Sequence, residues 1–124
     1  MYENTSVKIA KSKHFQVKKN KKTGKKHVHF KKKGPSVLKF YADWCGGCQA
    51  NHEHFLALSD KGYCVWVVDV DILSDLSNDL IIQAIPTVFF VDSKGKLHPY
   101  QDSFEIAELE KSFEAFMLSE LIED

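Results

Sequence analysis

Two strand-like runs with a helix-like segment between them constrain the fold of this chain more than any other feature. Residues 36–42 form an apolar run suited to a buried central strand, and residues 63–70 form a second one. Between them, residues 47–59 carry apolar side chains at helical spacing. This order predicts a β-α-β unit whose two strands lie parallel in one sheet.

The rest of the C-terminal part extends this sheet. Residues 74–83 are expected to form a short helix, and residues 87–91 and 96–100 two strands joined by the turn residues Asp92–Gly95. Asp102, followed by Glu105, predicts the cap of a last helix. Its apolar face would hold Ile106, Leu109, Phe113, Phe116 and Met117. We therefore expect an α/β domain with a mixed central sheet and helices on both faces.

Two cysteines stand where the first apolar run meets the first helix. At a helix N-terminus, unpaired N–H groups and the helix dipole favour a thiolate, so Cys45 is the expected nucleophile. Cys48 lies about one turn further on and is the expected resolving thiol. Gly46 and Gly47 allow a tight turn that leaves the outer sulfur open, and Trp44 would form an apolar shoulder beside it. Such a dithiol needs no cofactor.

The residues around these cysteines resemble a known family. The segment Phe40–Cys48, FYADWCGGC, is similar to the active-site segment of thioredoxins and protein disulfide isomerase domains, and Ile85–Phe90, IPTVFF, is similar to their second landmark. The resemblance covers roughly residues 36–121 and implies a thioredoxin fold. It also implies that Pro86 follows a cis bond and faces the dithiol, and that the Ile85 backbone binds an extended substrate strand. Protein disulfides would be the substrates, and a reductase would donate electrons.

Three positions depart from the family pattern. Lys39 stands where the family keeps a buried acid. A charged Lys39 would favour thiolates, whereas a Lys39 that reaches solvent would not. Gly47 replaces the usual proline and leaves the dithiol loop less constrained. Asp102 and Ser103 stand where the family commonly has a glycine, which puts recognition by a standard thioredoxin reductase in question.

Charge divides the chain into two parts. Residues 1–34 contain twelve lysines and one glutamate, a net charge of +11, and residues 35–124 carry −11. We therefore expect a lysine-rich N-terminal segment, residues 1–34, on a thioredoxin-like domain, residues 35–124. Residues 14–18 and 27–31 alternate apolar and polar side chains around a turn at residues 20–24. This pattern predicts a hairpin, after a first strand near Val7.

The run from Lys18 to Lys33 has two interpretations. It is a solvated basic hairpin without a specific ligand, or it binds an acidic partner or a polyanion such as nucleic acid or an acidic membrane. The chain has no arginine, the residue that grips guanine and phosphate with two parallel hydrogen bonds, which disfavours sequence-specific recognition of nucleic acid.

Length and composition set the remaining limits. With 124 residues and 44% hydrophobic content, the chain can bury one core. Its start lacks the apolar stretch of a secretory signal, and no run is long enough to span a membrane. We expect a cytoplasmic protein, with nuclear or virion association as open alternatives.

Three further features leave alternatives open. Cys64 is interpreted as a buried strand residue, with a regulatory thiol as the alternative. His52 and His54 are expected to face solvent, although with the cysteine pair their spacing also suits a metal site. The leading functional prediction is a thiol-disulfide oxidoreductase. Its rival is a redox-inactive or weakly active binding module that acts through the basic segment.

Overall fold

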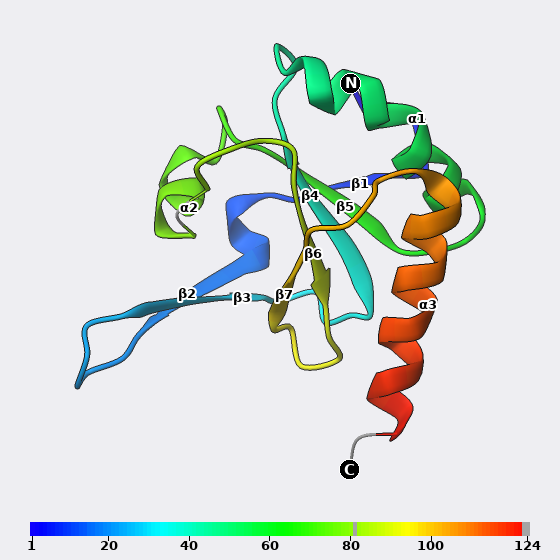
Figure 1. Cartoon of the computed structure of the whole chain (residues 1–124). Helices are drawn as coiled ribbons and strands as arrows, with labels where there is room; N and C mark the ends of the chain where they lie inside the picture. Colours follow the sequence, from blue (N-terminus) through cyan, green and yellow to red (C-terminus); the bar gives the residue numbers. More distant parts are fainter. Residues whose placement is uncertain (81, 123–124) are drawn as a thin grey trace.

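A mixed five-stranded sheet forms the centre of the molecule (Figure 1). The computed structural model describes residues 1–80 and 82–122. The sheet order is β1-β5-β4-β6-β7. β5 pairs parallel with β1 and β4, whereas β6 is antiparallel to β4 and β7 to β6. The strands are β1 (Lys8–Ile9), β4 (Ser36–Tyr41), β5 (Val65–Asp69), β6 (Thr87–Val91) and β7 (Leu97–Tyr100). The predicted β-α-β unit and C-terminal strand pair are both confirmed.

Helices cover both faces of this sheet. On one face lie α1 (Gly46–Asp60) and α3 (Ile106–Ile122), which contact each other and enclose Phe55, Leu109 and Phe113. The other face carries α2 (Ser74–Asp79) and a two-stranded hairpin (Figure 1). Because side chains alternate along a strand, Val37 and Tyr41 belong to the α1 face, and Leu38 and Phe40 to the opposite one. Lys39, between them, faces α1.

The hairpin joins β2 (Phe15–Lys19) to β3 (Lys26–Phe30), where alternation predicted it. Its base is apolar, since Phe15 and Phe30 pair with ring centroids 4.9 Å apart, and Phe30 packs on Trp66 at 5.2 Å. A short 3₁₀ helix, η1 (Ser12–His14), precedes it. All twelve lysines of residues 1–34 are exposed, so this segment is charged outside and apolar inside.

Three local predictions are wrong. Glu105 and Ser103 cap α3 in place of Asp102: the Glu105 carboxylate accepts from Ala107 N, and Ser103 Oγ from Glu105 N. Cys64 is half-buried and lies just before β5. α2 ends at Asp79, whereas the predicted helix ran to residue 83. Residue 81 of that predicted range lies outside the described residues.

The N-terminal residues contribute to the core more than the sequence suggested. Tyr2 and Val7 are 1% and 5% exposed and belong to the cluster that contains the dithiol. In the described residues, no helix has the length and apolar character needed to cross a membrane.

Candidate active site

Cys45 caps the first helix. The chain leaves β4 at Tyr41, turns, and enters α1 at Gly46, so that Cys45 is the extended N-cap residue. Its Sγ accepts a hydrogen bond from Cys48 N at 3.1 Å. An N-cap position places the sulfur beside unpaired N–H groups and the positive end of the helix dipole, which favours a thiolate.

The outer sulfur is less open than expected. Cys45 is only 6% exposed, and Cys48 is fully buried. Cover comes from Ile85, whose carbonyl oxygen lies 3.6 Å from Cys45 Sγ. Burial, followed by the hydrogen bond with Cys45, raises the pKa of Cys48 to about 11. All three cysteines are free thiols. A partner must therefore approach Cys45 closely, while Cys48 is reachable only from within.

Pro86 and Ile85 come from the loop before β6 and are half-buried. The Ile85–Pro86 bond is cis, as the resemblance implied, and so is Gly34–Pro35. Gly47 lies against Pro86: a Cβ at Gly47 would come within 3.2 Å of Pro86 Cδ. Pro86 also lines a groove of about 420 Å³ that includes Phe89, Tyr100 and Phe104. The two sequence motifs, about 40 residues apart, thus meet at the dithiol.

Trp44 and Gly46 lie on the open side of the motif. Trp44 is 69% exposed, and its indole Nε1 donates to Asp71 Oδ2 at 2.8 Å. Asp71, in the loop after β5, was not among the expected site residues. Gly46 is exposed and has free space where a side chain would stand. This side of Cys45 presents an aromatic ring next to bare backbone.

Lys39 lies fully buried on β4, so it does not reach solvent. Its Nζ donates to Tyr2 OH at 2.7 Å, Asn51 Oδ1 at 2.6 Å and the Cys48 carbonyl at 3.3 Å. Asn51 lies three residues after Cys48 on the same side of α1, a spacing visible in the sequence. Tyr2 lies 37 positions from Lys39, and no local pattern indicates that contact.

The two helix histidines pack against the protein, which makes the expectation of solvent-facing rings wrong. His52 packs against Tyr2 in a tilted arrangement with ring centroids 4.4 Å apart, and His54 Nδ1 accepts from Ile106 N at 3.0 Å. His54 thereby helps to cap α3. Across residues 1–80 and 82–122, no group of three or more His, Cys, Asp or Glu side chains is placed to hold a metal ion.

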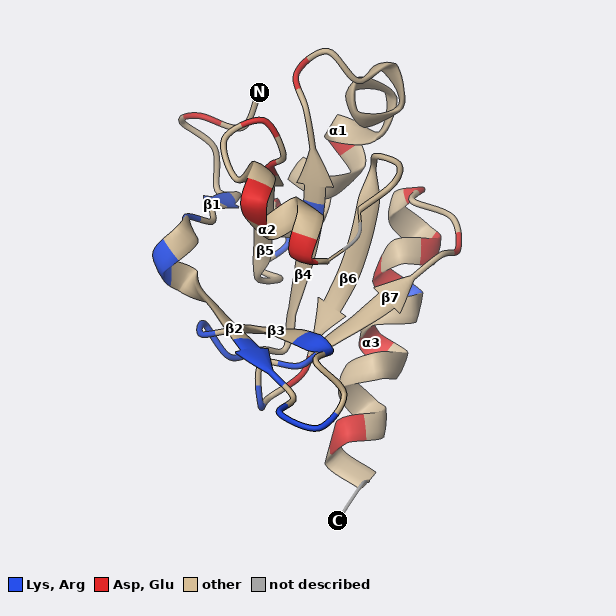
Figure 2. Cartoon of the chain, turned by 90° about the vertical axis from the view of Figure 1, so that its left-hand side faces the viewer, with Lys and Arg blue, Asp and Glu red and all other residues tan. Residues whose placement is uncertain are grey.

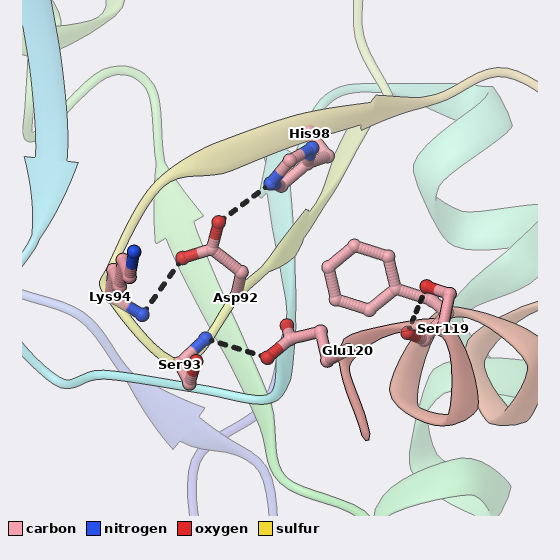
Figure 3. A pocket seen from close by; sticks show the side chains of 7 residues that line it. Asp92, Ser93, Lys94, His98, Ser119 and Glu120 are labelled. Carbon is pink, nitrogen blue, oxygen red and sulfur yellow. Dashed lines mark hydrogen bonds and ion pairs between the residues drawn. The ribbon is translucent and has the colours of Figure 1, made fainter. Parts of the chain in front are cut away.

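A second hollow, of about 400 Å³, lies between the β6–β7 turn and the end of α3 (Figure 3). Asp92 accepts hydrogen bonds from Lys94 N and from His98 Nε2, and Glu120 accepts one from Ser93 N. Pro86 precedes β6 and Asp92 follows it, so this hollow lies at the far end of the strand from the dithiol. Its polar groups tie the turn to α3.

Comparison with a family model identifies the family to which this chain belongs. The model described as Thioredoxin matches residues 14–115, most of the chain and both motifs. The chain belongs to the thioredoxin family. This confirms the resemblance and the thioredoxin fold.

Individual relatives agree with this membership. Thioredoxin from Borreliella burgdorferi is 34% identical over 74 residues, which cover 57% of this chain and 63% of that protein. The chain thus spans less than two thirds of that relative's length. The crystal structure of Schistosoma mansoni thioredoxin is 32% identical, with a TM-score of 0.55 over 65% of this chain and 75% of that one. A crystal structure of ERdj5 shares the fold over 92% of this chain and 14% of its own, at a TM-score of 0.68 and 20% identity.

Proposed function

We propose that this protein is a thiol-disulfide oxidoreductase that reduces or isomerises protein disulfides through Cys45 and Cys48. One observation carries the proposal. The Cys45 sulfur caps α1 and accepts the Cys48 N–H at 3.1 Å, with the Cys48 side chain buried below the opening. Cys45 is then the attacking thiol, because its position favours the thiolate, and Cys48 is the resolving thiol.

The reaction needs only the two thiols. The Cys45 thiolate attacks one sulfur of a substrate disulfide, forms a mixed disulfide, and releases the other substrate sulfur as a thiolate that takes up a proton. Cys48 then loses its proton to solvent and attacks Cys45 Sγ. The bond between Cys45 and the substrate breaks with its electron pair on the substrate sulfur, which takes up a proton. Two electrons have moved to the substrate, and a reductase must restore the dithiol. A reducing compartment such as the cytoplasm suits this direction.

Substrate binding is assigned to the rim of Cys45. An extended segment would lie along the Ile85–Pro86 backbone and continue into the groove that Pro86 lines. Trp44 supplies an exposed apolar surface, and Gly46 and Gly47 add no side chain that would obstruct a protein substrate. Catalytic roles are assigned to Cys45, Cys48 and Pro86. Substrate-binding roles are assigned to Trp44, Gly46, Gly47 and Ile85.

The basic segment is proposed to contact partners and not to take part in the chemistry. Figure 2 shows its lysines gathered along β2, β3 and the turns beside them, with acidic residues over α2 and α3. Such a surface attracts polyanions through long-range charge. We propose residue 34 as the boundary of this segment. It marks a change in charge within one packed domain, since Tyr2, Val7 and Phe30 are core residues.

Trapping tests the order of attack. With Cys64→Ser as background, Cys48→Ser should accumulate mixed disulfides with insulin whose disulfides are intact, because this variant keeps the attacking thiol and lacks the resolving thiol. Cys45→Ser should trap none, and Cys45 should also be alkylated faster than Cys48 at neutral pH. Mass spectrometry of the adducts gives the readout. Equal trapping by both variants would contradict the roles.

Equal insulin reduction by the intact protein and the Cys45→Ser, Cys48→Ser variant would favour the binding-module alternative.

A further inference from the structure

A buried cation contacts the backbone of the second cysteine of the dithiol. Lys39 is fully enclosed, yet its three hydrogen-bond partners, Tyr2 OH, Asn51 Oδ1 and the Cys48 carbonyl, are all neutral. Its Nζ also lies 4.5 Å from the centroid of the Phe55 ring. Lys39 forms no ion pair with a carboxylate in the part of the chain that the structure describes. Buried charges are normally paired with an opposite charge, so a nearby anion would stabilise the Lys39 ammonium.

The titratable groups around Lys39 come from two segments. The N-terminal segment supplies Tyr2, and burial raises the pKa of its phenol, which therefore stays neutral. From α1 and its cap come His52, Cys48 and Cys45. Burial, and then Lys39 itself, lowers the pKa of His52, which is never an anion. Only the two thiols can supply a negative charge near the ammonium.

The thiols and Lys39 influence each other. Burial lowers the pKa of Lys39 to about 8, while the charges of Cys48 and Cys45 act to raise it. Lys39 in turn opposes the effect of burial on Cys48. A disulfide carries no charge, so oxidation removes the two groups near Lys39 that can become anionic.

We propose that Lys39 is the buried counter-charge of the dithiol: its ammonium stabilises the thiolate that forms on Cys48 in the resolving step. This inference rests on the proposed function. When Cys48 gives up its proton to solvent, the negative charge on its sulfur meets the ammonium held behind it. The electron pair then forms the Cys45–Cys48 bond, and the anion leaves with the substrate. Lys39 is a positioning residue, because it acts through Cys48 and touches no substrate.

The proposal predicts that Lys39 binds its proton more tightly in the dithiol form. Its pKa should be higher in the reduced than in the oxidised protein at pH values where a thiolate is present. Nitrogen-15 NMR of the lysine side chains measures the pKa of Lys39 in the reduced and the oxidised form of the unmutated chain. The Cys45–Cys48 disulfide must form reversibly on oxidation. A failure at that step would count against the proposed function, whereas equal Lys39 pKa values in both forms would overturn the role of Lys39 alone.

Variants give a second measurement. In the Cys45→Ser, Cys64→Ser background, Lys39→Met should raise the Cys48 pKa by about one unit or more, since an opposite charge nearby is lost. With both active-site cysteines present, Lys39→Met should slow release of the mixed disulfide about threefold for each unit of that shift, because a thiolate with a higher pKa is scarcer but also more nucleophilic. It should barely change the first attack by Cys45. The reduction potential should also fall, by about 30 mV for each tenfold change in the equilibrium constant.

Controls separate charge from structure. Lys111→Met removes an exposed lysine on α3 and should change none of these quantities. Tyr2→Phe keeps the buried ring but removes the hydroxyl that accepts from Lys39, and should give a smaller change in the same direction. A folded Lys39→Met variant with an unchanged Cys48 pKa and an unchanged resolving rate would overturn the proposal. If Lys39→Met does not fold, Tyr2→Phe and the NMR comparison decide.

Discussion

Lysine occurs in two opposite environments in this protein. The twelve lysines of residues 1–34 are all exposed, and Figure 2 shows lysines along the hairpin and the turns beside it and also on β1 and the segment that follows it. Lys39, five residues beyond this segment, is fully buried between β4 and α1. The exposed ammonium groups keep their water and cost the fold little. The buried one has exchanged water for two side-chain oxygens and a carbonyl.

The comparison shows that charge along the chain does not tell which residues build the core. Residues 1–34 have the composition of a solvated tail, yet Phe15, Val28 and Phe30 form part of the core below the sheet. The apolar run of β4, by contrast, contains the one lysine that is buried among the described residues. Alternation along β2 and β3 explains the first fact, because it separates the apolar face of the hairpin from the charged one. Lys39 is buried because both faces of the central strand β4 are covered.

The largest expected effect tests whether the basic segment is structural. Phe30→Ala should lower the free energy of unfolding by about 3–5 kcal/mol, because a fully buried ring is replaced by a cavity. Urea denaturation followed by tryptophan fluorescence measures it, since Trp66 lies against Phe30. Val17→Ala is the control on the same hairpin. Val17 is 43% exposed, and its loss should cost less than about 1 kcal/mol. Similar small losses for both variants would show that the hairpin is not part of the core.

The second effect concerns the cost of burying Lys39. Its pKa falls from 10.5 in the unfolded chain to about 8 in the folded protein, chiefly through burial. Between these values the unfolded state binds more protons, so the contribution of Lys39 to stability rises with pH. Below about pH 8 the full penalty is present, about 3 kcal/mol.

Lys39→Met makes this penalty measurable. The stability gained by Lys39→Met over the protein that keeps Lys39 should be largest below the lowered pKa of Lys39, and should shrink as pH rises from that pKa toward 10.5. Both proteins should carry Cys45→Ser and Cys48→Ser, because the raised pKa of Cys48 contributes with the opposite sign. The raised pKa of Tyr2 is common to both proteins and largely cancels in the difference. Urea denaturation at several pH values provides the measurement. A gain that is independent of pH would mean that Lys39 is not buried as an ammonium.

Local patterns predicted most of the fold, and non-local contacts account for the errors. The strand at residues 36–42 and the helix at 47–59 match Ser36–Tyr41 and Gly46–Asp60 closely, because apolar periodicity is a local property. The burial of Cys45 depends on Ile85, 40 residues away, and one of the three hydrogen-bond partners of Lys39 is Tyr2. The cap of α3 involves His54, from another helix. No spacing within a short segment carries this information.

The smallest expected effect on the fold tests the exposed lysines as a binding surface. The variant Lys21→Gln, Lys22→Gln, Lys25→Gln removes three charges at the hairpin tip. The variant Lys94→Gln, Lys96→Gln, Lys111→Gln removes three exposed charges away from that tip, on the β6–β7 turn and on α3. Both should keep the stability within about 0.5 kcal/mol, since surface substitutions rarely do more.

A single-stranded oligonucleotide serves as the polyanion, with affinity measured by fluorescence anisotropy at several salt concentrations. Each lysine that contacts it contributes about 0.7 to the slope of log affinity against log salt. The hairpin variant should therefore lose about 2 from this slope, and the other variant much less. Equal losses would mean that net charge and not the hairpin attracts the polyanion, and no loss in either would remove the basic segment as a polyanion site.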